Sequence, residues 1–264
     1  MLIGREQELA QLVHAIHARR SLLVHGAAGA GKTALLEEAL SSLPPRIRRM
    51  CLVCTSCENP RTIWRCLVRS LAKIEDPRVL SYVRRECAGT AKVEHWLSKQ
   101  SSLRLRGILR RAMLGNAYWV FLDAAAPLPD GVHNLLQDWV WSRRTPVILL
   151  GRGLTEEELG RVAKLFWHSG MRLELLRMPT LDLEELLEFS IVRFGLSRVA
   201  SADFRDFVLK RAGGLPGRIV GLCELASQSV YPCPGHVKLH TLAVDFLMQH
   251  TAGAPRFQGA NPNA

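Results

Sequence analysis

GAAGAGKT, residues 26–33, decides how the rest of this sequence is interpreted. It fits the pattern G-x-x-x-x-G-K-[ST] at every fixed position, and it joins the apolar run SLLVHG to a helical pattern that starts at Thr33. The glycines let the backbone curl so that its N–H groups point at phosphate oxygens, and the amino end of the next helix adds positive potential. The stretch therefore predicts a phosphate-binding loop between a buried strand and a helix.

The last two residues of this loop carry its chemistry. Lys32 is expected to reach the β- and γ-phosphates of a nucleotide, and the Thr33 hydroxyl to ligate Mg²⁺. The pattern therefore predicts ATP and Mg²⁺ as cofactors. The residues that we expect to surround the phosphates are Gly26, Ala27, Ala28, Gly29, Ala30, Gly31, Lys32, Thr33 and Ala34.

A second stretch, VFLDAAAPL at residues 120–128, predicts the end of a buried strand that delivers one carboxylate, Asp123. A P-loop NTPase needs such a carboxylate at the end of a neighbouring strand to hold the water shell of Mg²⁺. We therefore expect Asp123 to share the metal with Thr33. An aspartate that only caps a strand is the alternative.

The residue after Asp123 is Ala124, where hydrolysing enzymes usually place a second acid that orients or deprotonates the attacking water. A methyl group cannot polarise water. Asp130 is close in sequence, but it follows Pro127 and Pro129 and is expected to cap the next helix. The sequence therefore predicts slow hydrolysis, or hydrolysis that needs a group from a partner.

A third candidate is Arg152, which follows the apolar run PVILL in the segment LLGRG. We expect it to emerge from the strand beside the first one, near the γ-phosphate, as a sensor of bound triphosphate. The predicted catalytic set is thus Lys32, Asp123 and Arg152. A surface arginine without a function is the alternative at this position.

Strand patterns alternate with helical patterns in the first two thirds of the chain, which predicts an α/β fold with a parallel sheet covered on both faces. After MPTLD the patterns are helical only. We expect a core over residues 1–179, a small helical domain over residues 180–250 and a disordered tail over residues 251–264. The predicted strands are 21–26, 50–55, 118–123, 146–151 and 171–176. The predicted helices are 6–19, 33–43, 61–74, several within 75–115, 131–142, 155–167, 183–195, 202–213, 216–228 and 236–249.

The net charge of +11 is concentrated in one block. Residues 46–115 hold 16 Lys and Arg against 5 Asp and Glu, while the rest of the chain holds 19 of each. Two interpretations stay open: solvated helix faces, or a surface that binds the phosphates of double-stranded DNA by counterion release. The block has few aromatic residues, so stacking on single-stranded bases has little support.

The sequence has no run of 18 apolar residues, so no membrane span is expected. Its first residues show no signal-peptide pattern, so we expect a cytoplasmic protein.

Three of the seven cysteines, Cys51, Cys54 and Cys57, are spaced C-x2-C-x2-C. A metal or iron–sulfur site would need a fourth ligand, for which Cys66 is the candidate. The same residues fit a buried strand, in which cysteine behaves as a small hydrophobe, and no second C-x2-C pair follows. We therefore favour a structural role. The odd number of cysteines also argues against a disulfide framework.

These motifs resemble those of AAA+ ATPases of the origin-recognition and STAND type. LIGREQE, residues 2–8, resembles the family's N-terminal box, which implies that Gly4 and Arg5 lie near the nucleotide. VFLDA resembles a Walker B motif without its second acid. GGLPGRI, residues 213–219, resembles the lid motif, which implies that Pro216 presses on the nucleotide and that Arg218 acts as a second sensor.

The resemblance implies a RecA-like sheet, a helical lid and ATP-dependent assembly into a homo-oligomer. A neighbouring subunit may supply an arginine finger in such proteins, and Arg161 and Arg172 are the candidates here. PGRIVGLCELA is also similar to a segment of transposon-targeting ATPases, which polymerise on DNA. This similarity favours DNA as the partner of the basic block.

Three hypotheses follow. The first is an ATPase that assembles with ATP and Mg²⁺ and engages double-stranded DNA through residues 46–115. The alternative is a STAND-like switch that exchanges nucleotide and acts on a protein partner. The third is a P-loop kinase, against which the C-terminal helices and the GGLPG segment argue. Steep salt dependence of DNA affinity would favour the first hypothesis over the second.

Overall fold

The computed structural model describes residues 2–55, 57, 59–86, 93–114, 118–124, 130–142, 145–233 and 236–251. The chain divides into two compact units, the first ending at Leu176 and the second starting at Arg177. This boundary is close to the predicted division between residues 179 and 180. Apart from Thr251, the predicted tail lies outside the described residues. The two units are described separately.

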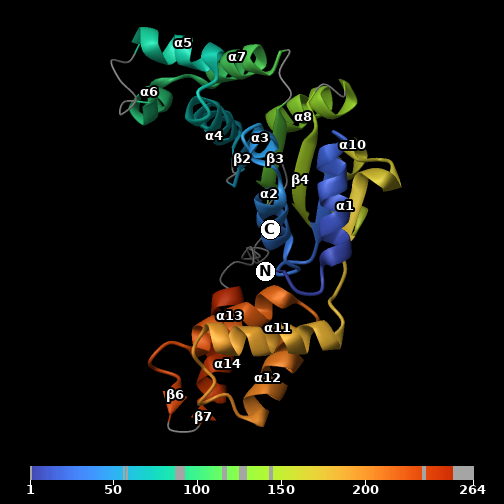
Figure 1. Ribbon diagram of the computed structural model, residues 1–264, viewed down its shortest axis with the longest axis vertical. Helices are drawn as coiled ribbons and strands as arrows, with labels where there is room; N and C mark the ends of the chain where they lie inside the picture. The colour runs from blue at the N-terminus through green and yellow to red at the C-terminus, as the bar shows by residue number, and fades with distance from the viewer. Residues whose placement is uncertain are drawn as a thin grey trace, which may run out of the picture. The chain divides into compact units, whose positions relative to one another are not determined.

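The first unit is built on a five-stranded parallel sheet with the strand order β2-β3-β4-β1-β5 (Figure 1). This architecture confirms the predicted α/β fold with a RecA-like parallel sheet. The carboxyl ends of parallel strands meet at one edge, so residues from distant parts of the chain come together there. The strands are β1 (Leu22–Gly26), β2 (Cys51–Cys54), β3 (Trp119–Ala124), β4 (Val147–Arg152) and β5 (Arg172–Leu175).

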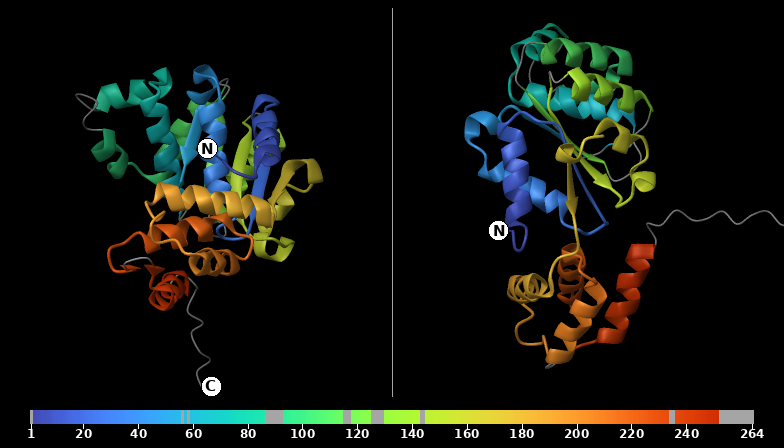
Figure 2. Two further views of the ribbon diagram at one scale, coloured as in Figure 1. Left: turned by 60° about the horizontal axis from the view of Figure 1, so that its bottom comes forward. Right: turned by 90° about the vertical axis from the view of Figure 1, so that its right-hand side faces the viewer.

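Both faces of the sheet are buried, because the apolar runs that form its strands leave no face polar. On one face, Leu23, Leu122 and Leu149 belong to a core cluster that includes residues of α4, α7 and α8. Side chains alternate along a strand, so Val24 and Ile148 face the other side, where α1 and α2 lie (Figure 2).

Apart from α3, which was not predicted, the helices of the first unit lie close to their predicted positions. They are α1 (Glu6–His17), α2 (Lys32–Ser42), α3 (Pro45–Arg48), α4 (Pro60–Lys73), α5 (Pro77–Glu86), α6 (Val93–Lys99), α7 (Ser102–Met113), α8 (Asp130–Ser142), α9 (Glu156–Leu159) and α10 (Arg161–Leu165). The single helix predicted over residues 155–167 was wrong, because Gly160 adopts a left-handed φ of 56° and separates α9 from α10. Among the described residues, no helix has the length and apolar character that a membrane crossing requires.

Helices α4 to α7 form an insertion between β2 and β3 and hold most of the basic block. A buried aspartate, Asp76, ties this insertion to the sheet. Its Oδ1 accepts the backbone N–H groups of Arg78 and Val79 at the start of α5, at 3.0 and 3.1 Å. Its Oδ2 accepts the hydroxyl of Tyr118, just before β3, at 2.6 Å. Burial, together with this bond to Asp76, raises the pKa of Tyr118, so the phenol stays protonated and able to donate.

The second unit packs helices around its own core, which includes Leu187, Phe204, Val208 and Leu222. Gly213 ends α12 in a left-handed conformation, and Pro216 starts α13, the usual pairing of glycine after a helix and proline at the start of one. The elements are α11 (Thr180–Arg193), α12 (Ala202–Ala212), α13 (Pro216–Ala226), β6 (Pro232–Cys233), β7 (His236–Val237) and α14 (Leu239–Thr251). The short hairpin β6–β7 was not predicted.

Replacing Tyr118 by Phe should lower stability, because the buried Asp76 carboxylate then loses a hydrogen-bond donor. We expect a loss of about 1–3 kcal/mol in the free energy of unfolding, measured by urea denaturation. The matched control is Tyr82→Phe, since the hydroxyl of Tyr82 accepts a hydrogen bond, among the described residues, only from the exposed side chain of Arg111. Equal losses for the two variants would contradict the role given to Asp76.

Candidate functional site

The loop between β1 and α2 has the backbone that the glycine pattern predicts. Gly31 is the N-cap of α2 and has a φ of 93°, in the left-handed region that favours glycine. A Cβ on Gly26 would lie 2.8 Å from the carbonyl oxygen of Leu175, so the loop passes too close to β5 for any side chain there. Glycine is therefore required at position 26 for space and at position 31 for its backbone conformation, and both glycines belong to the motif GAAGAGKT.

The amino end of α2 is free to receive an anion. Within the described residues no side chain caps it, and its first turn contains no acidic residue. The first backbone N–H groups of a helix lack partners within the helix, and the helix dipole gives this end positive potential. The curled loop and helix start are compatible with a phosphate group, and phosphate binding by residues 26–34 stays a prediction.

Lys32 folds back over the loop. Its Nζ donates hydrogen bonds to the carbonyl oxygens of Gly26, at 2.9 Å, and Ala27, at 2.8 Å. Burial lowers the pKa of Lys32; the nearby Asp123 opposes this effect, and Arg152 adds to it. Lys32, Asp123 and Arg152 are therefore close enough to interact electrostatically, although they come from α2, β3 and β4.

Thr33 and Asp123, the predicted metal ligands, are in direct contact. The Thr33 hydroxyl donates a hydrogen bond of 2.8 Å to Oδ2 of Asp123. Asp123 lies on β3, which is separated from β1 by β4, so it is one strand further from the loop than the sequence suggested. A hydroxyl and a carboxylate side by side are ligands that Mg²⁺ accepts together with water and phosphate oxygens, so these residues fit the metal.

Arg152 ends β4 at the register position opposite Gly26 of β1, beside the phosphate-binding loop as predicted. Its side chain is exposed. The next residue, Gly153, ties this strand end to the loop, because its N–H donates to the carbonyl of Gly26 at 3.3 Å. Sequence analysis did not single out Gly153, although the glycines on both sides of Arg152 in LLGRG were a signal for it.

The N-terminal box lies in the first unit and is held by its own contacts. Arg5 is buried, its Nη1 donates to Glu8 at 2.6 Å, and its Nη2 donates to the carbonyl of Leu176. The Nε of Arg5 is buried and has no hydrogen-bond partner among the described residues. The N–H of Gly4 donates to Glu6 at 3.2 Å. A role of Gly4 and Arg5 toward a nucleotide stays a prediction.

Other predicted residues lie elsewhere. Ala124 is the last residue of β3, directly after Asp123. Pro216 and Arg218 belong to the second unit, where Pro216 is buried and Arg218 exposed on α13. Their contact with a nucleotide also stays a prediction.

The two candidate arginine fingers differ in how they are held. Arg172 donates to the carbonyls of Phe166 and Ala163 at 2.6 and 2.9 Å and pairs with Glu156 at 2.8 Å. These contacts hold its guanidinium against its own chain. Arg161 is exposed at the start of α10. For both residues, the role of an arginine finger stays a prediction.

The cysteines of β2 and α4 serve packing. Cys54 is buried, and the thiol of Cys66 bonds Cys54 and the carbonyl of Val53, the latter at 3.4 Å. Burial raises the pKa of Cys51 to about 12, so its reactive thiolate is scarce at neutral pH. Within the described ranges, no three His, Cys, Asp or Glu side chains gather as metal ligands. The structural interpretation is therefore the better supported one.

Comparison with known proteins identifies the family to which this chain belongs. A sequence profile of the AAA ATPase domain matches residues 1–162, which include Lys32, Thr33, Asp123 and Arg152. No curated protein matches the chain.

Two solved structures share the fold. The Orc1 protein of Aeropyrum pernix, solved in complex with DNA, is 15% identical, with a TM-score of 0.61 over 93% of this chain and 66% of that one. Cdc6p of Pyrobaculum aerophilum is 12% identical, with a TM-score of 0.54 over 86% of this chain and 62% of that one. The chain thus spans about two thirds of the first protein and less of the second. At these identities the likeness concerns the fold alone.

Replacing Thr33 by Val removes the hydroxyl next to Asp123 while keeping the shape of the side chain. ATP affinity in Mg²⁺ should fall about 10- to 100-fold, as when support for a metal site is lost, whereas affinity in EDTA should barely change. Isothermal titration calorimetry measures both values. An equal loss in Mg²⁺ and EDTA would show that Thr33 does not serve the metal.

Replacing Arg152 by Ala should reduce the preference for ATP over ADP. A charged hydrogen bond to the γ-phosphate is worth about 1.5–3 kcal/mol, so ATP should bind about 10- to 150-fold more weakly while ADP affinity stays the same. Competition with a fluorescent ATP analogue measures the ratio. The control is Lys164→Ala, at an exposed position on α10. An unchanged ratio in Arg152→Ala would remove Arg152 from the site.

Proposed function

Because the chain belongs to the AAA ATPase domain family, we propose that it binds ATP with Mg²⁺ at the carboxyl edge of its sheet. The bound nucleotide controls assembly of a cytoplasmic homo-oligomer or a conformational switch. The observation that carries this proposal is the convergence of Lys32, the Thr33–Asp123 pair and Arg152 beside an uncapped helix start.

Each of these residues has a distinct task. When ATP binds, the Nζ of Lys32 leaves the carbonyls of Gly26 and Ala27 and donates hydrogen bonds to the β- and γ-phosphates instead. Arg152 contacts the γ-phosphate. Thr33 and Asp123 hold Mg²⁺, which neutralises charge on the phosphate oxygens when bound. Arg5, whose buried Nε lacks a partner among the described residues, contributes to the nucleotide site together with Gly4.

The family resemblance supplies two further parts of the site. Pro216 and Arg218 of the second unit close on the nucleotide as a lid. This assignment rests on the GGLPGRI motif and is independent of the contacts within the first unit.

Hydrolysis is slow or depends on a partner. A general base normally contributes about 10²- to 10⁴-fold to such a reaction, and Ala124 cannot act as one. A group from a neighbouring subunit or another protein then completes the site, and Arg161 is the candidate cation in that contact.

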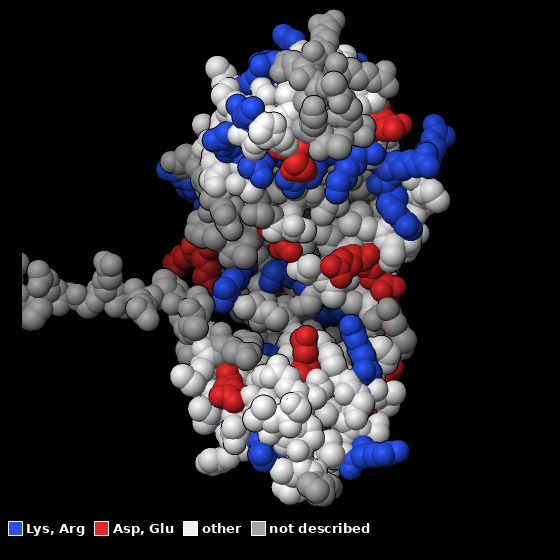
Figure 3. Space-filling model, turned by 90° about the vertical axis from the view of Figure 1, so that its left-hand side faces the viewer, with Lys and Arg blue, Asp and Glu red and all other residues white. Residues whose placement is uncertain are grey.

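We further propose that the basic block engages double-stranded DNA. Several of its cations are taken up by contacts within the fold: Arg61 donates to the carbonyls of Ser98 and Gln100, and Arg69 pairs with Glu94. Others are exposed and make no side-chain hydrogen bond or ion pair within the described part of the chain, namely Arg46, Arg49, Lys73 and Lys99. Lys and Arg gather over the region of α5 to α7 at the top of the face in Figure 3. The solved Orc1 relative, which is bound to DNA, adds support.

A nucleotide-controlled signalling switch with a protein partner is the second candidate. The alanine after Asp123 favours it, since a switch needs binding and exchange but no rapid turnover. In this case DNA would leave the ATPase rate unchanged.

Replacing Ala124 by Glu should restore the missing acid. We expect turnover of ATP by this variant to exceed that of the wild type by about tenfold or more, a part of what a general base normally contributes. A phosphate-release assay measures the rates, with and without duplex DNA. The double variant that also carries Lys32→Ala is the control and should be inactive. If wild type hydrolyses ATP as fast as Ala124→Glu, another residue already acts as the base.

Duplex DNA should bind with steep salt dependence. Each phosphate contact contributes about −0.9 to the slope of log affinity against log salt concentration. Lys73→Glu and Lys99→Glu should each remove one contact and so make this slope less negative by about 0.9. Fluorescence anisotropy at several salt concentrations measures it. Lys164→Glu, at an exposed lysine on α10, is the control outside the block. A slope near zero for wild type would exclude the DNA proposal and favour the signalling switch.

A further inference from the structure

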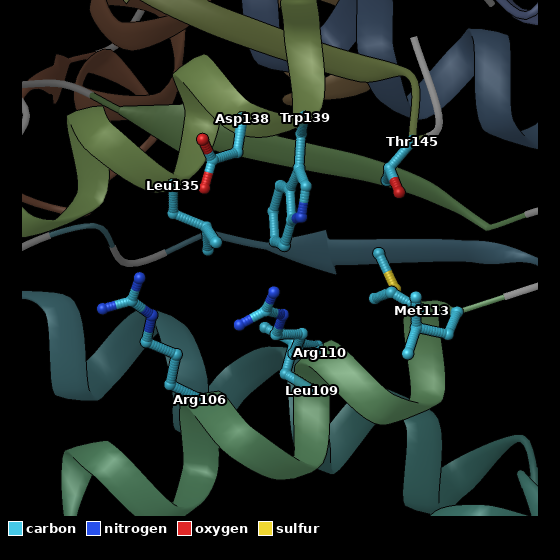
Figure 4. Close-up of a pocket in the computed structure, with 9 residues that line it drawn as sticks. Arg106, Leu109, Arg110, Met113, Leu135, Asp138, Trp139 and Thr145 are labelled. Carbon is cyan, nitrogen blue, oxygen red and sulfur yellow. The ribbon is translucent and has the colours of Figure 1, made fainter. Parts of the chain in front are cut away.

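The first unit has a pocket of about 370 Å³ between α7, in the basic insertion, and α8, which follows β3. This size is within the range of sites that take a small ligand or one side chain of a partner. In Figure 4, arginines from α7 point across the pocket toward Asp138 and Trp139 of α8. The residues that line it are Arg106, Leu109, Arg110, Met113, Leu114, Leu135, Asp138, Trp139 and Thr145.

The pocket has an apolar base and a polar rim. Leu109, Met113, Leu135 and Trp139 are 1–8% exposed, so only their edges reach solvent and form an apolar surface. One rim carries the exposed guanidinium groups of Arg106 and Arg110, one helical turn apart. The other carries the carboxylate of Asp138 on α8. None of the ion pairs among the described residues joins Asp138 to either arginine.

The outer face of α7 beside the pocket is apolar where a solvated helix would be polar. Leu103 is 80% exposed and Leu114 53% exposed, and they lie on the same side of the helix as Arg110. Gly107 lies between them, and a Cβ there would have no neighbour within 4 Å. Glycine inside a helix costs about 1 kcal/mol relative to alanine, and here it leaves the backbone open to the approach of another molecule.

This composition matches a protein partner better than DNA. Arginine, tryptophan and methionine are enriched in protein interfaces and in their energetic centres. A phosphodiester backbone gains nothing from the apolar base, and the carboxylate of Asp138 repels it. The guanidinium groups of Arg106 and Arg110 form no ion pair with the described residues, and they fit carboxylates, which arginine binds in a two-pronged geometry.

We propose that the α7–α8 pocket binds a protein segment that inserts one large apolar side chain and places an acidic residue next to it, against Arg106 and Arg110. Asp138 accepts a hydrogen bond from the segment's backbone or from a basic side chain. The two helices precede and follow β3, the strand that ends in Asp123. The partner therefore contacts both helices that flank the strand of the nucleotide site.

The test is a selection from a random 12-residue peptide display library with the wild-type protein. Enriched peptides are expected to combine a large apolar residue with Asp or Glu within two positions of it. A fluorescent synthetic copy should bind at least about tenfold more weakly to the Arg106→Glu/Arg110→Glu variant, as expected for arginines at an interface centre. The matched control is Lys73→Glu/Lys99→Glu, which makes the same charge change elsewhere in the basic block and should leave peptide binding unchanged.

A second measurement needs no variant. Binding of the selected peptide to the wild-type protein should slow hydrogen exchange in α7 and α8. Three results would overturn the proposal: enriched peptides without acidic residues, equal loss of peptide binding in the lysine control, or no protection of α7 and α8. A pocket that serves DNA would show the reverse pattern, in which Arg106→Glu/Arg110→Glu abolishes duplex binding and leaves peptide binding intact. If the protein does not bind duplex DNA at all, the prediction for peptide binding stays the same.

Discussion

The hydrogen bond from Thr33 to Asp123 is the contact on which the rest of the site depends. It joins the first turn of α2 to the end of β3, although β4 lies between β1 and β3. The bond is possible only because all three strands run parallel and end at the same edge of the sheet. The same arrangement places Arg152, at the end of the intervening strand, opposite Gly26. A lysine, the two predicted metal ligands and an arginine thus gather around one loop.

Much of the site could be predicted from local sequence patterns. GAAGAGKT specifies the loop because its glycines are needed where the backbone turns or approaches β5. Asp123 and Arg152 each follow an apolar run, which marks the end of a buried strand. The full order of the strands could not be predicted, because periodicity describes one strand at a time and pairing depends on distant residues. The strand of Arg152, β4, lies next to β1 as expected, whereas the strand of Asp123, β3, lies one strand further away.

Other features depend on contacts that no local pattern contains. The break at Gly160 lies inside a sequence that reads as one helix. The sequence also gives the charge of the basic block without showing which cations remain available. Arg78, for example, donates to the carbonyls of Arg111 and Ala112 at the end of α7, whereas Arg106 and Arg110 stay exposed. The pocket between α7 and α8 follows from the packing of helices that are far apart in the sequence.

Ala124 stands where the family resemblance implies a second acid. Its methyl group is expected to affect hydrolysis of ATP but not binding of ATP, so nucleotide binding is the property to measure first. The most direct measurement is calorimetric titration of ATP into the wild-type protein, with Mg²⁺ and with EDTA. The geometry at Thr33 and Asp123 predicts one site per chain and tighter binding in Mg²⁺. Absence of binding, or equal affinity in both conditions, would contradict the assignment of this edge of the sheet as an ATP and Mg²⁺ site.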